Sequence, residues 1–223
     1  MINNKHTYLT DKKPVIIIGA SSHACVCMEI LEYQGNKIVG FVDDDIQLIG
    51  SQLFGYNVIG NISYGIDKLK NNNCLTAFIG IGNNKDRKKI VEMSKDISIS
   101  RYVNATHNSS IISRRVKNGH GNFIGPCVSI KLGTTLGDFV IINTGATIGH
   151  DVVINDYVQI SPGCNLTGYV IVEEGAFLGA GSVVIPGKKI GAYAVVGAGA
   201  VVIHDVPPFT TVVGNPAKII KKN

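Results

Sequence analysis

The chain has 223 residues, among them 31 Ile, 24 Val and 26 Gly, and only 17% of its residues are charged. This composition excludes a disordered chain and disfavours a helical bundle, because β-branched residues and Gly form helices poorly. The net charge of +5 hides an acidic excess within residues 121–206, which excludes a continuous nucleic-acid-binding face there, whereas the basic flanks favour a phosphate-bearing small molecule.

The sequence carries no signal for a membrane or for secretion. No segment approaches the ~18 consecutive apolar residues of a membrane helix, and the first apolar run, 15–18, is too short for a secretory signal. The five cysteines form no CxxC pair, and Cys25 and Cys27 lack the second pair that a tetrahedral metal site needs. We therefore expect a cytoplasmic protein with reduced cysteines, no bound metal and no membrane insertion.

Alternating apolar runs and turns in the first half predict a small parallel α/β unit of the Rossmann type. The turn at 19–23 contains a single glycine, so the GxGxxG fingerprint of NAD-binding domains is missing. The N-terminus of the helix that follows can still face an anion. The expected strands and helices cover residues 14–18, 24–33, 37–42, 75–81 and 85–95, with a further extended element that ends at 58–59.

Polar residues follow two of these strands. Asp43, Asp44 and Asp45 come after the second strand, where acidic residues commonly accept hydrogen bonds from sugar or base groups. A solvated turn is the alternative interpretation. Asn83 and Asn84 follow the last strand, where Asn also caps helices, and capping does not exclude a ligand role.

The second half contains an aliphatic residue at every sixth position without a slip, and four residues after each comes a small or β-branched residue, except at Lys188. Three such hexads make one triangular coil of short strands, and stacked coils pair in parallel. The residue directly after the aliphatic is often Gly or Asn, as at Gly125 and Asn143, and we expect positive φ there. The aliphatic series is Ile124, Ile130, Leu136, Ile142, Ile148, Ile154, Ile160, Leu166, Val172, Leu178, Val184, Ile190, Val196 and Val202.

This geometry links one histidine to one glycine. His150 lies two places after Ile148, at a corner of the prism, and therefore points outward. One coil has eighteen residues, so Gly168 is predicted to stack on His150 in the next coil, one strand spacing of ~4.8 Å away. A glycine at this position leaves space beside the imidazole.

Motifs from both halves resemble those of one family over nearly the whole chain. They are the segments 19–23 (GASSH), 41–44 (FVDD) and 81–90 (IGNNKDRKKI), followed by the hexads. They are similar to those of the bacterial sugar O- and N-acyltransferases, and most of all to the N-acetyltransferases of nucleotide-linked 4-amino sugars. The resemblance implies a Rossmann-like domain that binds the nucleotide sugar, a left-handed parallel β-helix that binds acetyl-CoA, and a homotrimer with sites between neighbouring prisms.

The same resemblance sets the expected domain organisation. An N-terminal extension covers residues 1–13, the nucleotide-sugar domain 14–105, the β-helix 106–206 and a C-terminal tail 207–223. The tail matches the usual ending of these acyltransferases, and we expect its last residues to form a short helix capped near Asn215.

The resemblance also assigns roles to residues. His150 corresponds to the catalytic base, since an attacking amine must lose a proton and imidazole titrates in the right range. Asp151 would orient the ring, although many relatives carry Glu there. Substrate binding is assigned to Ser21, Ser22, His23, Asp43, Asp44, Gly82, Asn83 and Asn143. Binding of acetyl-CoA is assigned to Gln159, Gly168, Ala180 and Ala198.

Two of these assignments have further consequences. The resemblance makes the Gly168 N–H an oxyanion donor. Gln159 stands where close relatives have a second His, and it is half a coil from His150. If both residues serve one site, they are expected to come from adjacent subunits.

Three alternative functions differ in the residues or the substrate that they require. O-acetylation of a sugar hydroxyl, for example on sialic acid, is the alternative within the family. A β-helical carbonic anhydrase would need three histidines across an interface, and His107, His120, His150 and His204 contain no closely spaced pair. A trimeric scaffold or sugar-nucleotide-binding protein is the non-enzymatic alternative.

Overall fold

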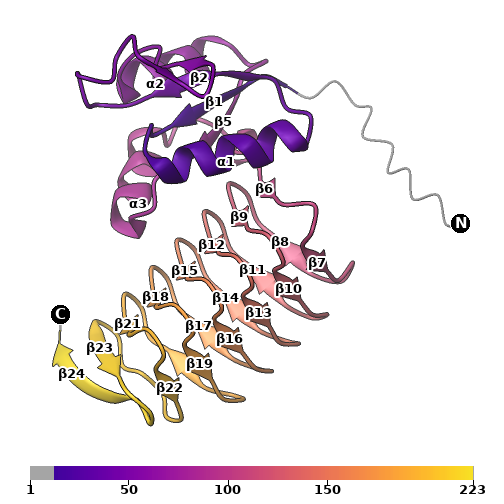
Figure 1. Cartoon of the computed structure of the whole chain (residues 1–223), viewed down its shortest axis with the longest axis vertical. Helices are drawn as coiled ribbons and strands as arrows, with labels where there is room; N and C mark the ends of the chain where they lie inside the picture. The colour runs from indigo at the N-terminus through magenta and orange to yellow at the C-terminus, as the bar shows by residue number, and fades with distance from the viewer. Residues whose placement is uncertain (1–12, 223) are drawn as a thin grey trace, which may run out of the picture.

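A computed structural model describes residues 13–222, which form an α/β unit followed by a three-sided β-solenoid (Figure 1). Nearly all of the expected N-terminal extension, residues 1–12, lies outside this range. Within the described residues, no helix is long and apolar enough to cross a membrane.

The α/β unit is built on a parallel sheet with the order β2-β1-β5. Alternate residues of the central strand face opposite sides: Ile17 packs with α1, and Ile16 packs with α2 and α3. A two-stranded hairpin, β3–β4, lies beside β2. The elements are β1 (Val15–Ile18), α1 (Ser22–Tyr33), β2 (Ile38–Val42), β3 (Gln52–Leu53), β4 (Tyr56–Asn57), α2 (Ile62–Asn71), β5 (Thr76–Ile79), α3 (Asn84–Met93) and the 3-10 helix η1 (Ile99–Arg101).

Helix α2 is missing from the sequence-based prediction, although the sequence contains its signals. The Asn61 side chain caps it by accepting a hydrogen bond from the Tyr64 N–H. Ile62, Ile66 and Leu69 have the spacing of one helical face, and all three are buried.

The β-solenoid has three faces, each a ladder of very short strands. Face 1 contains β6 (Ala105–Thr106), β9 (Phe123–Ile124), β12 (Ile141–Ile142), β15 (Gln159–Ile160), β18 (Phe177–Leu178), β21 (Val195–Val196), β23 (Thr210–Val213) and β24 (Lys218–Lys222). Face 2 contains β7 (Ile111–Ile112), β10 (Ser129–Ile130), β13 (Thr147–Ile148), β16 (Asn165–Leu166), β19 (Val183–Val184) and β22 (Val201–Val202). Face 3 contains β8 (Lys117–Asn118), β11 (Thr135–Leu136), β14 (Val153–Ile154), β17 (Ile171–Val172) and β20 (Lys189–Ile190).

The six-residue period is confirmed by the core of the solenoid. All fourteen aliphatic residues of the series are buried in one cluster, together with most of the small residues of the second register. Each strand pairs in parallel with the strand eighteen residues away, as Thr147 does with Ser129 and Asn165. The predicted α/β unit and left-handed parallel β-helix are both present.

The prediction of which corner residues take positive φ is wrong by two places. The left-handed residues come three positions after the aliphatic, for example Gly145 (φ 68°) and Asp151 (φ 55°). The glycines directly after the aliphatic are needed for a different reason, which is close approach between coils. A Cβ on Gly149 would lie 2.6 Å from the Thr167 carbonyl carbon, so no side chain fits there.

The predicted helix in the tail is also wrong. Residues 210–213 form β23, which continues face 1 parallel to β21, and 218–222 form β24, antiparallel to β23. Thr210, Thr211, Val212 and Val213 are β-branched residues, which favour a strand over a helix. A reversal at Gly214 (φ 98°) then brings the basic last strand back along this one.

The α/β unit rests on face 1 and on the corner between faces 3 and 1, called corner 3/1. The His23 ring at the start of α1 meets the Phe123 ring of β9 edge-on, with 5.1 Å between ring centroids. Helix α3 lies along corner 3/1, where the buried Arg87 side chain donates hydrogen bonds to the carbonyl oxygens of Phe139 and Tyr157, both at 3.0 Å. These contacts therefore determine which side of the prism the α/β unit covers.

Candidate active site

His150 and Asp151 lie together at the corner between faces 2 and 3, called corner 2/3. The His150 Nδ1 atom is 2.9 Å from Asp151 Oδ2, and both side chains are about half exposed. Asp151 has φ 55°, and its N–H donates to the Leu132 carbonyl oxygen of the previous coil at 3.1 Å. When the carboxylate accepts a hydrogen bond from Nδ1–H, the Nε2 atom of the neutral ring is free to accept a proton.

Gly168 lies against the imidazole, as its eighteen-residue offset from His150 predicts. A Cβ atom on this glycine would lie 2.7 Å from both Cε1 and Nε2 of His150, so the ring occupies the space that a side chain would fill. Within residues 13–222 the Gly168 N–H donates no hydrogen bond. The unpaired Gly168 N–H therefore lies beside His150 Nε2, the ring nitrogen that can accept a proton.

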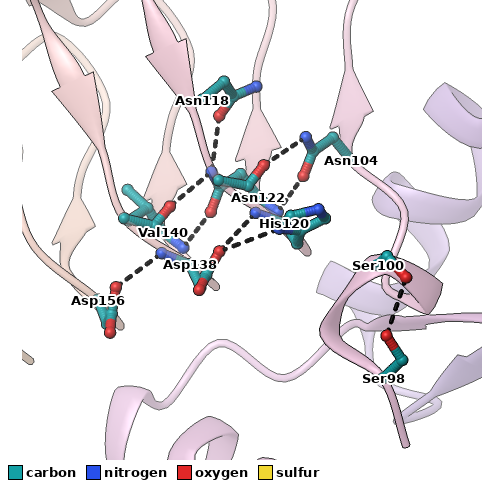
Figure 2. A network of polar contacts seen from close by, with 11 residues as sticks. Ser98, Ser100, Asn104, Asn118, His120, Asn122, Asp138, Val140 and Asp156 are labelled. Atoms are coloured by element: carbon teal, nitrogen blue, oxygen red, sulfur yellow. Dashed lines mark hydrogen bonds and ion pairs between the residues drawn. The ribbon is translucent and has the colours of Figure 1, made fainter.

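A second histidine–carboxylate pair lies at corner 3/1 (Figure 2). His120 Nδ1 is 3.4 Å from Asp138 Oδ1, and this carboxylate also accepts the His120 backbone N–H at 2.7 Å. Asp156, one coil further, accepts the Asp138 N–H at 2.8 Å, and the buried Asn122 side chain extends the network. These side chains satisfy backbone groups of the first coils, so we assign the pair a structural role.

The predicted ligand turn of the α/β unit opens onto a cavity. Ser21 precedes α1 without a side-chain capping bond, which leaves the N–H groups of the first helical turn available to an anion. A cavity of about 550 Å³ begins beside Ser22 and runs between α1 and the β3–β4 hairpin. It is lined by Ala20, Ser22, Cys25, Val26, Met28, Glu29, Glu32, Leu53 and Phe54.

His23 lies on the other side of α1, against the solenoid. Burial, with a smaller contribution from the positive charge of Arg87, lowers its pKa from 6.5 to about 4. Its Nε2 atom is 3.6 Å from Cys27 Sγ. The side chain is therefore a neutral imidazole at neutral pH.

Asp43 and Asp44, which follow β2, hold the loops of the α/β unit together. The Asp43 carboxylate accepts the N–H groups of Ala20 at 2.7 Å and of Asp45 at 2.9 Å. Asp44 accepts the N–H of Ile62, at the start of α2, at 3.0 Å. The Asp43 carboxylate thus joins the ends of β1 and β2, where the predicted ligand turn lies.

The remaining predicted substrate residues are spread over both parts of the chain. Asn83 caps α3 by accepting the N–H groups of Lys85 and Asp86. The Gly82 carbonyl oxygen accepts a hydrogen bond from Arg87 at 2.6 Å. Asn143 lies on the solenoid, at the corner between faces 1 and 2, and accepts the Thr144 N–H at 2.8 Å.

Arg87 has a role that the sequence analysis missed. Its guanidinium donates hydrogen bonds to four carbonyl oxygens, those of Ile81, Gly82, Phe139 and Tyr157. Burial lowers its pKa to about 10, so it remains charged. The only hint in the sequence is a lone Arg among lysines on the expected helix, and the spacing alone does not separate it from a surface residue.

The predicted acetyl-CoA residues lie on different parts of the prism. Gln159 is on β15 of face 1, partly exposed, while Ala180 and Ala198 are exposed one coil apart at the corner between faces 1 and 2. His150 and Gly168 are at corner 2/3, the edge opposite face 1. The chain does not bring Gln159 next to His150, because the packed core of the prism separates them.

The histidines of the solenoid are likewise dispersed. Among residues 13–222, no group of three or more His, Cys, Asp and Glu side chains is placed to hold a metal ion. All five cysteines are free thiols.

Comparisons with known proteins identify the class. Residues 14–94 match the PglD N-terminal domain, and residues 133–168 match the bacterial transferase hexapeptide (six repeats). Together with the solved structures described next, these matches show that the chain belongs to the bacterial sugar acyltransferase family and is an acetyltransferase.

Particular solved structures are similar over almost the full length. A variant of perosamine N-acetyltransferase from Caulobacter crescentus, in complex with CoA and GDP-perosamine, is 36% identical with a TM-score of 0.85, covering 93% of this chain and 97% of that one. The acetyltransferase domain of PglB from Neisseria gonorrhoeae FA1090, in complex with acetyl coenzyme A, is 30% identical with a TM-score of 0.85, covering 94% and 100%. WeeI from Acinetobacter baumannii AYE is 29% identical with a TM-score of 0.82, covering 92% and 99%.

A curated relative matches a short segment. Serine acetyltransferase from Buchnera aphidicola subsp. Schizaphis graminum is 70% identical over 27 residues, and the chain spans only 10% of its length. The match covers 12% of this chain and supports no conclusion about its substrate.

Proposed function

We propose that this acetyltransferase transfers the acetyl group of acetyl-CoA to the 4-amino group of a nucleotide-linked deoxyamino sugar. The observation that carries the proposal is the His150–Asp151 pair, with the imidazole packed against Gly168. The similar Caulobacter crescentus enzyme, crystallised with CoA and GDP-perosamine, supports the choice of substrates. The free thiols fit a cytoplasmic location.

The proposed reaction uses His150 as a general base. The amine attacks the thioester carbonyl carbon, and Nε2 takes the proton that the nitrogen loses. A C–N bond forms, the C–S bond then breaks, and CoA leaves as the thiol after accepting that proton. Asp151 holds Nδ1–H and thereby keeps Nε2 directed at the amine. The unpaired Gly168 N–H is suited to stabilise the oxyanion of the tetrahedral intermediate.

The nucleotide sugar is proposed to bind in the α/β domain, residues 14–105. The free N-terminus of α1, preceded by Ser21, suits the diphosphate, and the adjoining cavity has room for a nucleoside. Ser22 and His23 begin the helix, Asp43 and Asp44 support the turn, and Gly82 and Asn83 flank it across the sheet.

A complete site is proposed to need two chains. The α/β domain rests on face 1 and corner 3/1, whereas His150 lies on the opposite edge of its own β-helix (106–206). A sugar held near Ser22 therefore meets the His150 of a neighbouring copy. Gln159, Ala180 and Ala198 would then border acetyl-CoA from the neighbouring prism, and Asn143 would contact the sugar. A homotrimer, the expected assembly, provides three such sites.

Thiol release tests the proposal. Wild-type protein is assayed with acetyl-CoA and a panel of UDP-, dTDP- and GDP-linked 4-amino sugars. His150→Asn is expected to lower kcat by about 10²- to 10⁴-fold, because proton transfer loses its acceptor. Turnover by His150→Asn at the wild-type rate would contradict the role of His150.

The matched control is His120→Asn, which removes the other imidazole–carboxylate pair. It is expected to leave kcat within about twofold of wild type, since that pair satisfies the backbone at corner 3/1. Acetylation of a hydroxyl analogue in preference to the amine would replace the proposal by O-acetylation. Thiol release with none of these sugars would contradict the proposed class of acceptor.

A further inference from the structure

Tyr169 occupies a left-handed backbone position that glycine fills two coils before it and one coil after it. In the column of left-handed residues at corner 2/3, Gly133 (φ 76°) and Gly187 (φ 70°) flank Asp151 (φ 55°) and Tyr169 (φ 61°). A left-handed conformation is unfavourable for a residue with a Cβ and a bulky ring. Such strain is retained where the side chain contributes something that glycine cannot.

For Asp151 the contribution is the hydrogen bond to His150, and Tyr169 contacts the same imidazole. The two ring centroids are 5.0 Å apart, and the ring planes meet at 89°, an edge-to-face arrangement. The Tyr169 N–H also donates to the His150 carbonyl oxygen at 3.1 Å. Both left-handed residues with side chains in this column therefore touch one histidine.

Stacking on other aromatic residues does not explain why residue 169 carries an aromatic ring. The left-handed aromatic residues at corner 3/1 stack on one another, as Phe139 does on Tyr157 with centroids 5.6 Å apart. Tyr169 is 61% exposed, and His150 is its only ring partner among the described residues. Its side chain thus adds a contact to His150 and little to the core.

We propose that Tyr169 is a positioning residue for His150, an inference that rests on the proposed role of His150 as the base. A single hydrogen bond from Nδ1 to Asp151 fixes one atom of the imidazole but leaves the plane of the ring free to tilt about it. The Tyr169 ring, perpendicular to that plane, removes this freedom and keeps Nε2 above Gly168. Proton transfer depends on this direction, because small misplacements of reacting groups strongly slow a reaction.

The substitution Tyr169→Gly separates an effect on stability from an effect on catalysis. Tyr169→Gly restores the residue type of Gly133 and Gly187, so its unfolding midpoint in urea is expected to equal or exceed that of wild type. Its kcat is expected to fall about tenfold or more, with both KM values changed less than about twofold. Tyr169→Phe keeps the ring and is expected to stay within about twofold of the wild-type kcat.

The control is Cys127→Gly, which relieves the same left-handed strain (φ 56°) at an exposed position on another corner. It is expected to leave kcat unchanged. A wild-type kcat for Tyr169→Gly would overturn the proposal, as would a Tyr169→Phe variant as slow as Tyr169→Gly, or a loss confined to KM. If His150→Asn retains full activity, the proposed function fails, which is a separate result from any of these.

Discussion

The His23 ring connects the start of α1 to the solenoid, and its burial there disfavours protonation of the imidazole. Its ring packs edge-on against Phe123 and lies near Arg87, and burial there lowers its pKa to about 4. In the unfolded chain the same imidazole has the ordinary value of 6.5. Between these two values the unfolded chain binds a proton that the folded protein does not.

This difference predicts an acid-sensitive stability. Because the folded pKa is lowered, the free energy of unfolding falls as the pH drops from 6.5 to about 4, by at most about 1.4 kcal/mol per pH unit. His23→Gln, which does not titrate, is expected to lose less stability over this range. Urea unfolding at several pH values measures the slope.

Cys27→Ala is the control for this prediction. Burial holds the pKa of the Cys27 thiol well above 9, so the residue does not titrate in the acid range. The variant is expected to be less stable at every pH, with the wild-type slope preserved. Equal slopes for wild type and His23→Gln would contradict the assignment.

For single residues, the eighteen-residue period of the coil predicted positions in the structure better than the preferences of residue types did. Adding eighteen to His150 locates Gly168 correctly, because the period fixes the stacking. The preference of Gly for positive φ led to the wrong position, since Gly149 is required by contact with the next coil. Arg87 stayed hidden because its acceptors, Phe139 and Tyr157, come close only in the folded chain.

Helix α3 holds the two parts of the chain together through three kinds of contact. Arg87 binds the carbonyl oxygens of Phe139 and Tyr157, Asn84 donates to the carbonyl oxygen of Gly175, and Lys88 pairs with Glu174 at 2.7 Å. The Lys88 pair is partly exposed and contributes little, whereas the Arg87 side chain is buried. The helix therefore depends mainly on one side chain.

Arg87→Met is expected to destabilise the protein by roughly 2–4 kcal/mol, because four carbonyl oxygens lose the buried guanidinium that donates to them. Lys89→Met, on the exposed side of the same helix, is expected to change the stability by less than about 0.5 kcal/mol. Urea unfolding, followed by circular dichroism, gives both values. Equal stabilities for the two variants would show that α3 is held by other contacts.

In the solenoid, the strands that follow the six-residue repeat were predicted from sequence. The conformation of the tail was not, because it depends on contacts with the preceding coil. The hexad strands follow from periodicity alone. The tail was expected to be helical near Asn215, yet β23 finds a ready partner in the last coil, β21. An open strand edge favours a β-branched segment as the next strand, and this partner becomes visible only once the solenoid is built.

At the scale of the whole molecule, the prism separates the parts of the proposed site. The α/β domain lies over face 1 of the solenoid (Figure 1). Face 1 is one wall of a packed core, and His150, between β13 and β14, lies at corner 2/3 on the opposite edge. The sequence indicated this separation through the nine-residue offset of Gln159 from His150. It could not give the side on which the α/β domain lies, since contacts such as His23 with Phe123 set that.

A site shared between copies predicts that two inactive variants rescue each other. His150→Ala removes the base from one chain, and Ser22→Tyr fills the mouth of the cavity beside α1 in the other. Neither variant alone is expected to turn over substrate. In assemblies formed by denaturing and refolding an equal mixture, one interface in four joins an intact Ser22 to an intact His150, so about a quarter of the wild-type activity is expected.

The control for rescue is a mixture of His150→Ala with a double variant that carries both substitutions. Every interface in that mixture lacks His150, so no activity is expected. Light scattering reports whether the refolded chains form trimers. Trimers of the first mixture with no activity would place the whole site within one chain, and His150 would then have to act on a sugar that the solenoid itself holds, independently of the α/β domain.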